Sequence, residues 1–371
     1  MKRFGICFLL AALFLGSLAS CKKDDVAPAD LSVEGTANCY IVSEAGTYSF
    51  PAVIGNSLNS VGDVASVEVL WESFGTNNAP KAGELVHDLS YKDGIVLFKA
   101  SGKKGNAVLA AKDKSGTILW SWHIWMTDAP EEQEYANNAG IMMDRNLGAI
   151  SATPGDCGSY GLFYQWGRKD PFLGAGEDIE YTEGAQKAAA STLSWPEAVV
   201  SDAVKGTMEY AAAHPTTFII EGELNRDWLY TGEKTVDKTR WQPAKTVNDP
   251  CPAGWMVPEC GIDGIWGKAL GTVTDWENPF IWDDNVYGLD FSKTDKVLGF
   301  AGSIWYPASG LRYGNNAKLS GVGEAGGWWS VSNSFSYYAL VFCFYAGGVV
   351  LPSLDASRAF GCSVRCQKIQ Q

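Results

Sequence analysis

The stretch Asp249-Pro250-Cys251-Pro252-Ala253-Gly254-Trp255-Met256-Val257-Pro258 decides how the second half of this chain folds. Its prolines and glycine predict an ordered loop, because proline lacks the backbone N–H that a helix or a central strand requires. Trp255 is a large apolar side chain that must be buried. Residues 361–366 are predicted to form a closing strand with both cysteines on one face. A Cys251–Cys366 disulfide would close a loop worth about 4–5 kcal/mol in the chain-entropy model, so we expect this bond to hold the C-terminal part closed.

Residues 1–20 have the pattern of a lipoprotein signal peptide. An apolar run at residues 7–16 follows a basic start, and Leu18-Ala19-Ser20-Cys21 resembles a bacterial lipobox. Cys21 is therefore the predicted lipidation site, and residues 21–35 are the predicted lipid-anchored tether. The alternative is an ordinary secretory cleavage site that happens to precede a cysteine.

The chain is acidic, with a formal net charge of −13 and an isoelectric point near 4.8. Nucleic-acid binding needs a basic surface, so we expect no nucleic acid among the partners. Lys22-Lys23-Asp24-Asp25 is similar to the acidic tag of Bacteroidota lipoproteins that face outward from the outer membrane. We therefore predict a lipid-anchored protein of the outer membrane, exposed on the cell surface.

Cysteine usage fits an exported protein, in which disulfides are permitted. Nine cysteines are present, and without Cys7 of the leader and the lipidated Cys21 an odd number remains. At least one thiol is then free or bonds outside the chain. The candidate pairs, with the preferred one first, are Cys251–Cys366 and Cys260–Cys362.

Residues 36–128 are predicted to form an all-β, immunoglobulin-like sandwich, because short alternating segments are separated by turn signals and no helix is indicated. The expected strands are residues 39–42, 47–50, 67–71, 86–91, 95–99, 107–111 and 118–125. The last of these is apolar on nearly both faces, which indicates a central strand or one covered by the next domain. His123 in this strand is interpreted as a hydrogen-bonded structural histidine.

Residues 129–371 are predicted to form an α+β domain, which begins after an acidic link that contains proline. The expected helices are residues 185–190, 208–213 and 262–270, with further short helices at 161–169 and from 195. The expected strands are residues 298–304, 310–313, 328–332, 338–345 and 363–367.

Six short motifs resemble, in order, those of the Fibrobacter succinogenes major paralogous (FISUMP) domain family. They are MMDRNLGA (142–149), GLFYQWGRKDPF (161–172), DPCPAGWMVP (249–258), GLRY (310–313), GGWWSVS (326–332) and GCSVRC (361–366). The family occurs in secreted and surface lipoproteins of Bacteroidota and related bacteria. The resemblance implies a C-type-lectin-like fold for the second domain. It indicates a cellular location, at the cell surface, more than it indicates a biochemical activity.

Tryptophan is common, with 15 in the chain. Flat aromatic faces suit sugar rings, and the alternative is packing in the core. The aromatic residues in charged, loop-like contexts are the candidate ligand contacts, namely Trp228, Tyr230, Trp241, Trp276 and Trp282. Convergence of these side chains on one exposed concave face would favour binding, and their burial would favour a structural role.

An acidic loop is a candidate calcium site, because Asp283, Asp284 and Asp290 offer carboxylate oxygens within eight residues. The loop lacks the EF-hand spacing and the sugar-binding motifs of C-type lectins. A solvated acidic loop is the alternative, and no cofactor is predicted.

No catalytic constellation is evident. The three histidines form no metal-ligand pair, and no nucleophile elbow or phosphate loop is present. We therefore predict a non-catalytic adhesin or binding module for a glycan or protein ligand. The alternative is a structural or tip component of a fimbria-like or outer-membrane assembly. An enzyme that uses Cys362 on a formylglycine-generating scaffold is the third possibility.

Overall fold

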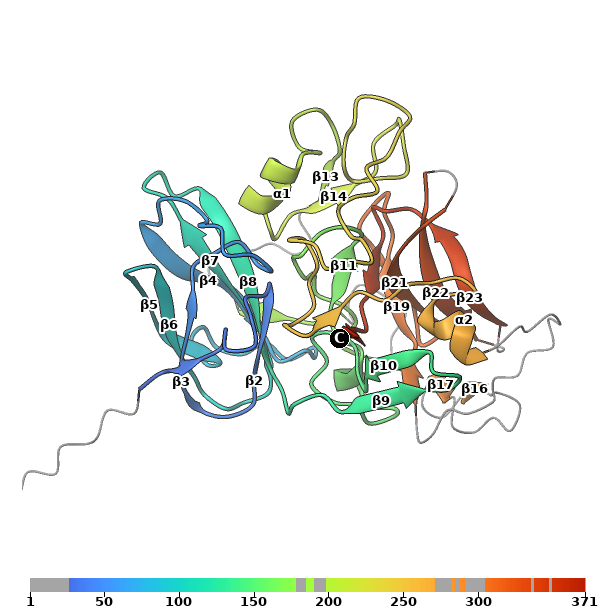
Figure 1. Cartoon of the computed structure of the whole chain (residues 1–371), viewed down its shortest axis with the longest axis horizontal. Helices are drawn as coiled ribbons and strands as arrows, with labels where there is room; N and C mark the ends of the chain where they lie inside the picture. The colour runs from blue at the N-terminus through green and yellow to red at the C-terminus, as the bar shows by residue number, and fades with distance from the viewer. Residues whose placement is uncertain are drawn as a thin grey trace, which may run out of the picture.

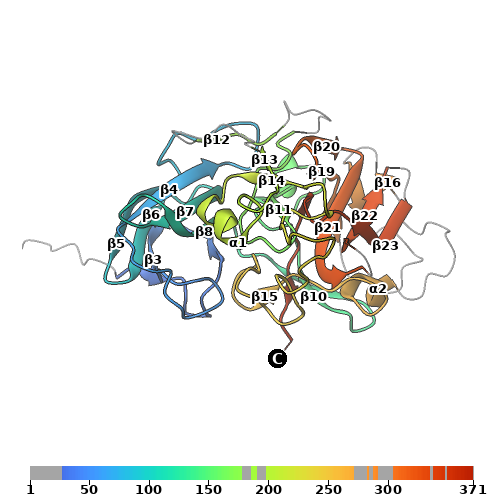
Figure 2. The same ribbon diagram turned by 90° about the horizontal axis from the view of Figure 1, so that it is seen from above.

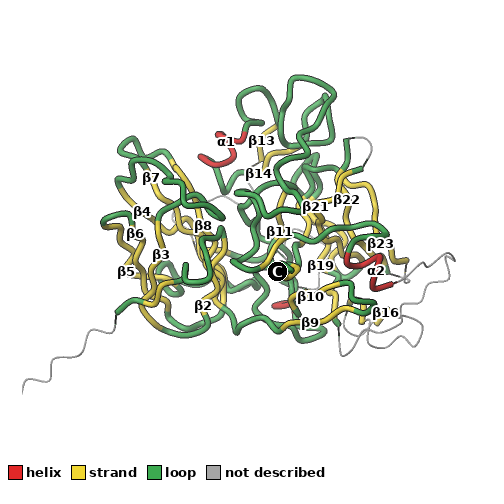
Figure 3. The backbone as a smooth tube through the Cα atoms, viewed as in Figure 1, coloured by secondary structure: helices red, strands yellow, loops and turns green. Residues whose placement is uncertain are grey.

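The structure is a computed structural model that describes residues 27–177, 185–189, 198–270, 282–283, 287–290, 304–334, 337–346 and 349–370. Strands and loops dominate it (Figure 3). Two halves lie side by side, with the N-terminal half in blue and teal and the C-terminal half running from green to red (Figure 1). The signal peptide, Cys21 and the start of the tether lie outside the described residues. Within those residues, no helix has the length and hydropathy to cross a bilayer.

The N-terminal half contains two sheets with a shared core. One sheet has the order β1 (Ala29–Asp30), β3 (Gly46–Pro51), β6 (Ile95–Ala100) and β5 (Val86–Lys92). The other has the order β12 (Ala188–Ala189), β4 (Ser66–Ser73), β7 (Gly105–Lys112), β8 (Ile118–Met126) and β2 (Cys39–Val42). Phe50 and Phe98 from the first sheet pack in one cluster with Trp122 and Ile124 from the second. All seven predicted strands are present, and the sandwich prediction is confirmed at this level.

The turn between β5 and β6 shows how the local sequence determines the strand connections in the N-terminal half. Asp93 and Gly94 have φ angles of 51° and 83°. Two successive positive φ angles define the type I′ turn, which matches the twist of a hairpin and which Asp-Gly favours. The predicted hairpin is therefore present at the predicted residues.

The C-terminal half is also rich in strands. A four-stranded sheet has the order β15 (Trp255–Met256), β25 (Gln367–Lys368), β10 (Gly140–Met143) and β9 (Glu132–Tyr135). A seven-stranded sheet has the order β11 (Phe163–Gln165), β24 (Gly361–Ser363), β19 (Ser309–Arg312), β21 (Ala325–Asn333), β22 (Ala339–Tyr345) and β23 (Val349–Ala356), with β20 (Leu319–Val322) beside β19. Smaller sheets pair β13 (Ala198–Val200) with β14 (Phe218–Ile220), and β17 (Gly288–Asp290) with β16 (Trp282–Asp283) and β18 (Trp305–Pro307).

The described helices in this half are short: α1 (Met208–Ala213), α2 (Ile265–Leu270) and the 3-10 turn η1 (Cys157–Ser159). Helix α1 matches the predicted 208–213, and the side chain of Thr207 caps it by accepting the N–H of Tyr210 at 3.0 Å. Helix α2 begins three residues later than predicted. The described part of this half is therefore mostly β, with fewer helices than the predicted α+β class implies.

Two expected helices are wrong. Residues 188–189 form strand β12, which pairs with β4 of the sandwich and lies along its edge (Figure 2). Residues 163–165 form β11, which pairs with β24. Both segments gain backbone partners from distant strands, and such pairing overrides a weak helix propensity. The helix expected to start at residue 195 begins outside the described residues, but residues 198–200, into which it would continue, form strand β13 instead. Most of the expected strand 298–304 also lies outside the described residues.

The predicted closing strand is divided between two sheets. Residues 361–363 belong to β24, and the chain then crosses to β25 at residue 367. Strand β25 pairs with β15 of the proline-rich loop, with Trp255 opposite Lys368. The C-terminus therefore lies beside the loop, as expected, although as two short strands rather than one.

One hydrophobic cluster joins the two halves. Trp71 and Trp125 of the sandwich pack in it with Leu147, Tyr164 and Trp329 of the C-terminal half. Strand β8 contributes Trp122 to the sandwich core on its other face. Strand β8 is therefore apolar on both faces because it lies between β7 and β2 in its sheet, with the sandwich core on one face and the second half on the other.

Candidate functional site

A chain of polar groups crosses the seam between the halves at His123. Its Nε2 lies 2.9 Å from Oδ1 of Asn106, and the amide of Asn106 donates to the carbonyl of Gly148 at 2.9 Å. The Asn106 oxygen can only accept, so Nε2 of His123 carries the proton. Nδ1 then accepts from the hydroxyl of Tyr164 at 3.4 Å. His123 is a buried, hydrogen-bonded residue, as predicted.

Acid will destabilise the protein through this histidine. Burial lowers the pKa of His123 to about 3, from 6.5. Between these values the unfolded chain binds a proton that the folded protein excludes, so stability is lost as the pH falls through this window. The loss is about 1.4 kcal/mol per pH unit. Urea titrations at several pH values should show this slope as the difference between the native protein and His123→Gln, and parallel curves would contradict it.

A buried charge cluster lies further along the same seam. It consists of Ser121 from β8 together with Arg168, Lys169 and Asp170 from the turn that follows β11. Lys169 Nζ lies 2.5 Å from an Asp170 oxygen, and that oxygen accepts the Ser121 hydroxyl at 2.6 Å. Burial lowers the pKa of Lys169, and Asp170 opposes the shift. The cluster ties the two halves together across the seam.

Arg168, Lys169 and Asp170 of the charge cluster line a cleft of about 290 Å³ between the sandwich and α1. Apart from Glu209 and Asn248, the other lining residues are apolar. Trp120 lies at the sandwich side with Lys169 Nζ 4.4 Å from its ring centroid. The other apolar lining residues are Ile54, Met208, Ala211, Ala212 and Val247. An apolar cleft with a few polar groups where two units meet is the usual form of a small-ligand site.

The sequence prediction missed this cleft. The signal that could have indicated it is the charged run Arg168-Lys169-Asp170, which follows the aromatic segment Phe163-Tyr164-Gln165-Trp166 after one glycine. Ser121 and Asp170 lie 49 positions apart, so only the tertiary fold shows their contact.

Lys169 Nζ also donates to the Ser121 hydroxyl at 2.5 Å, but the two residues do not make a nucleophile–base pair. Ser121 is 1% exposed, and its hydroxyl donates to Asp170, which also holds the lysine. A catalytic serine must reach a substrate carbonyl and release its proton to a base. In this arrangement the hydroxyl is inaccessible, and its proton is already held by a carboxylate.

Two of the candidate ligand-contact tryptophans are in the core, and that part of the prediction is wrong. Trp228 and Trp241 are fully buried. Trp228 belongs to a stack of alternating guanidinium groups and indole rings, which we call the Arg–Trp stack. Its order is Arg168, Trp228, Arg240, Trp166 and Arg358, with guanidinium-to-ring distances of 5.5, 4.8, 4.8 and 4.8 Å.

Trp241 packs against the Arg–Trp stack, with its ring centroid 5.8 Å from that of Trp166. Its indole N–H donates to the carbonyl of Asn248 at 2.7 Å. The charged residues in this part of the sequence indicated a surface, but the two directly beside these tryptophans, Asp227 and Arg240, form a buried ion pair. Tyr230 is half-buried, Trp276 lies outside the described residues, and only the backbone of Trp282 is described, in β16. The exposed aromatic face that would have favoured binding is therefore not formed by the tryptophans that the structure describes.

The calcium prediction finds no support in the described part of the acidic loop. Asp290 is buried in β17, which pairs with β18, and Asp283 lies in β16. Asp284 falls outside the described residues. Among the described residues there is no group of three or more histidine, cysteine or carboxylate side chains placed to hold a metal ion.

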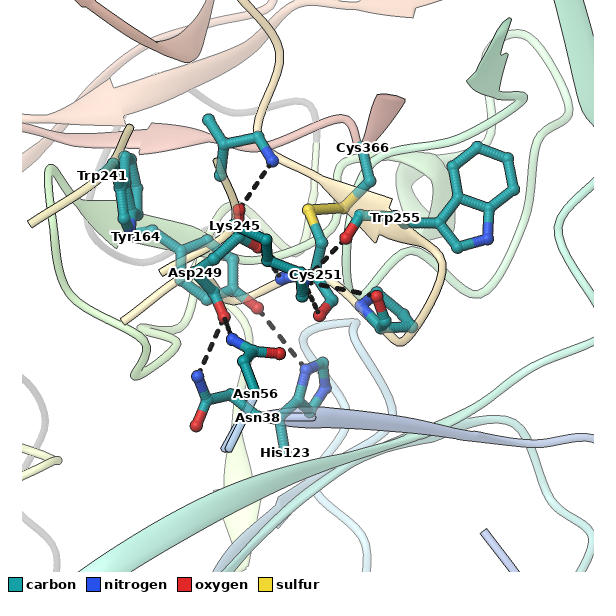
Figure 4. Close-up of a disulfide and its surroundings, with 12 residues drawn as sticks. Asn38, Asn56, His123, Tyr164, Trp241, Lys245, Asp249, Cys251, Trp255 and Cys366 are labelled. Carbon is teal, nitrogen blue, oxygen red and sulfur yellow. Dashed lines mark hydrogen bonds and ion pairs between the residues drawn. A yellow bond between two sulfur atoms is a disulfide. The ribbon is translucent and has the colours of Figure 1, made fainter. Parts of the chain in front are cut away.

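The preferred disulfide is present. Cys251 and Cys366 are bonded with an S–S distance of 2.09 Å (Figure 4). Beside them, Lys245 Nζ donates to the carbonyl of Cys251 at 2.8 Å and to that of Trp255 at 2.6 Å. Lys245 also pairs with Asp249 at 3.0 Å. The loop is thus held by a covalent bond and by a lysine that donates hydrogen bonds to several of its carbonyls in place of water.

The second candidate disulfide is absent, because Cys260 and Cys362 are both free. The Cys260 thiol donates to the carbonyl of Pro352 at 2.6 Å, and Cys362 lies in β24. Burial raises the pKa of Cys260 to about 12 and also raises that of Cys362. Neither thiol is therefore a ready thiolate nucleophile, which argues against catalysis by Cys362.

Comparison of the chain with family models, with curated proteins and with solved structures found no match. The FISUMP resemblance therefore rests on the six motifs alone.

Proposed function

We propose that this protein is a lipid-anchored surface protein that binds a small ligand or a ligand group in the cleft between its two halves. The cleft is the single observation that carries the proposal. It is concave, mostly apolar, and bounded by a compact set of charged side chains. Its walls come from both halves, whose shared hydrophobic core holds them in place.

The fold supports a display role. The pairing of β2 with β8 in parallel, with β3, β6 and β5 in the opposite sheet, supports an immunoglobulin-like order. The C-terminal half returns its last strand to the proline-rich loop, which supports the C-type-lectin-like assignment and the FISUMP resemblance. With the lipobox at Cys21, these features favour a module held at the outer membrane and facing outward.

Binding can be tested on a glycan array and by pull-down of surface proteins, with the chain from residue 26 onward. This form keeps every described residue. We expect retention of at least one glycan or protein ligand, and we expect Ala212→Trp to abolish it by filling the cleft. Ligand retention that is unchanged in Ala212→Trp would place binding elsewhere, and no retention of any ligand would contradict the proposal.

A structural role in a surface assembly is the second candidate function. Strand β23 is the end strand of the seven-stranded sheet, and an end strand can pair with another chain. Tyr345, opposite Val349 at this end of the sheet, is 44% exposed. Isolation of the protein from native membranes as a monomer would contradict this role.

A further inference from the structure

We infer that the cleft selects ligands that carry a carboxylate, which would bind beside Arg168 and Lys169. This inference rests on the proposed function and specifies the chemistry of the ligand. The observations behind it are the charge balance of the cluster, the uncharged acceptors around Arg168, and the apolar residues that line the rest of the cleft.

The charge cluster holds two cations and one anion. Arg168 and Lys169 are 2% and 5% exposed, and each forms an ion pair with Asp170, at 3.9 Å and 2.5 Å. A buried charge is costly unless it is paired, and one carboxylate cannot neutralise two cations. The other acid of the cleft lining, Glu209, is exposed on α1. The buried wall of the cleft therefore has an excess positive charge.

Arg168 satisfies its remaining donors with neutral oxygens. Its NH1 donates to Oε1 of Gln165 and to the carbonyl of Thr217, and its NH2 donates to the carbonyls of Ala211 and His214. These acceptors carry no full charge. Its Nε is buried and has no acceptor within the part of the chain that the structure describes. The guanidinium is thus positioned rigidly, while its charge is only partly compensated.

The rest of the cleft sets the size and character of the ligand. A volume of about 290 Å³ admits a single sugar ring or a short acyl chain. Ile54, Met208, Ala212 and Val247 supply apolar lining to the cleft. A suitable ligand has an apolar face and one carboxylate. Two sources fit this chemistry, acidic sugars and short fatty acids, and the experiment separates them.

Isothermal titration calorimetry at low salt with two matched pairs of probes tests the inference. The pairs are glucuronate with glucuronamide, and hexanoate with hexanamide, so that each amide has nearly the shape of its acid. We expect one acid to bind about tenfold or more tightly than its amide, because only the acid carries a charge opposite to the excess charge of the cluster. The acid that binds identifies the source.

Three variants locate the binding. Ala212→Trp should abolish it, whereas Ala213→Trp, the same change on a neighbouring residue of α1 outside the cleft lining, should leave it unchanged. Glu209→Gln removes the exposed acid and should tighten acid binding about twofold to threefold at low salt, with the gain lost at high salt. Circular dichroism of each variant confirms that the fold is kept. Weaker acid binding in Glu209→Gln would overturn the inference.

The other outcomes separate this inference from the proposed function. Acid and amide that bind equally, both blocked by Ala212→Trp, would overturn the charge selection and leave the binding function standing. If neither pair binds, but the array identifies a ligand whose binding Ala212→Trp abolishes, the carboxylate inference fails and the proposed binding function stands. If the array and all four probes show no binding, both fail.

Discussion

Replacing Arg240 by alanine is expected to lower the free energy of unfolding by about 3–5 kcal/mol, because it leaves a buried carboxylate without a partner. Arg240 forms a two-pronged ion pair with Asp227, and both side chains are at most 2% exposed. The guanidinium also lies 4.8 Å from the ring centroids of Trp166 and Trp228. Its removal would therefore also open a gap in the centre of the Arg–Trp stack. Urea denaturation followed by far-ultraviolet circular dichroism measures the loss.

Arg226→Ala is the matched control for this prediction. Arg226 pairs with Glu221 at 2.7 Å, but its side chain is 56% exposed. Exposed ion pairs contribute about 0–1 kcal/mol, so the control should lose no more than that. Equal losses in Arg226→Ala and Arg240→Ala would contradict the prediction, because they would show that burial does not raise the cost of losing the ion pair.

Removal of the disulfide is expected to have an effect of similar size. Cys251 and Cys366 are 115 positions apart, and a loop of this length is worth about 4–5 kcal/mol in the chain-entropy model. The double variant Cys251→Ser/Cys366→Ser should lose this amount. The fold should persist, because Lys245 still binds the carbonyls of the loop and β15 still pairs with β25.

Reductant provides the internal control for the disulfide. Dithiothreitol should destabilise the native protein by the same amount and should have no further effect on the double variant. A loss of less than about 1 kcal/mol in both experiments would mean that the unfolded chain is already restricted without the bond, which the entropic account does not allow. A further loss in the double variant would indicate a second disulfide.

The elements that could be predicted from the sequence are those defined by short-range signals. The sandwich strands alternate in polarity and are separated by turns such as Lys92-Asp93-Gly94, so their positions follow from local chemistry. Helix α1 occupies its predicted residues for the same reason. The segment 185–189 could not be predicted in this way, since its two-residue strand exists only because β4 supplies a partner.

The candidate site depended on contacts that sequence patterns do not contain. Trp228 is surrounded in the sequence by charged residues, which indicated exposure. The fold instead buries it between Arg168 and Arg240, because an indole face can accept a guanidinium that is paired elsewhere. Composition cannot distinguish a solvated charge from one buried in such a stack.

By itself, the sequence determined the strand-rich N-terminal half, the preferred pairing of Cys251 with Cys366, and a structural role for His123. These follow from alternation, turn chemistry and the stiffness of the proline-rich loop. The tertiary structure decided which tryptophans are buried, how the two halves join, and where the cleft lies. The physical reason is that Ser121, Asp170 and α1 are far apart along the chain, and only the packing of one half against the other brings their charges and apolar walls together.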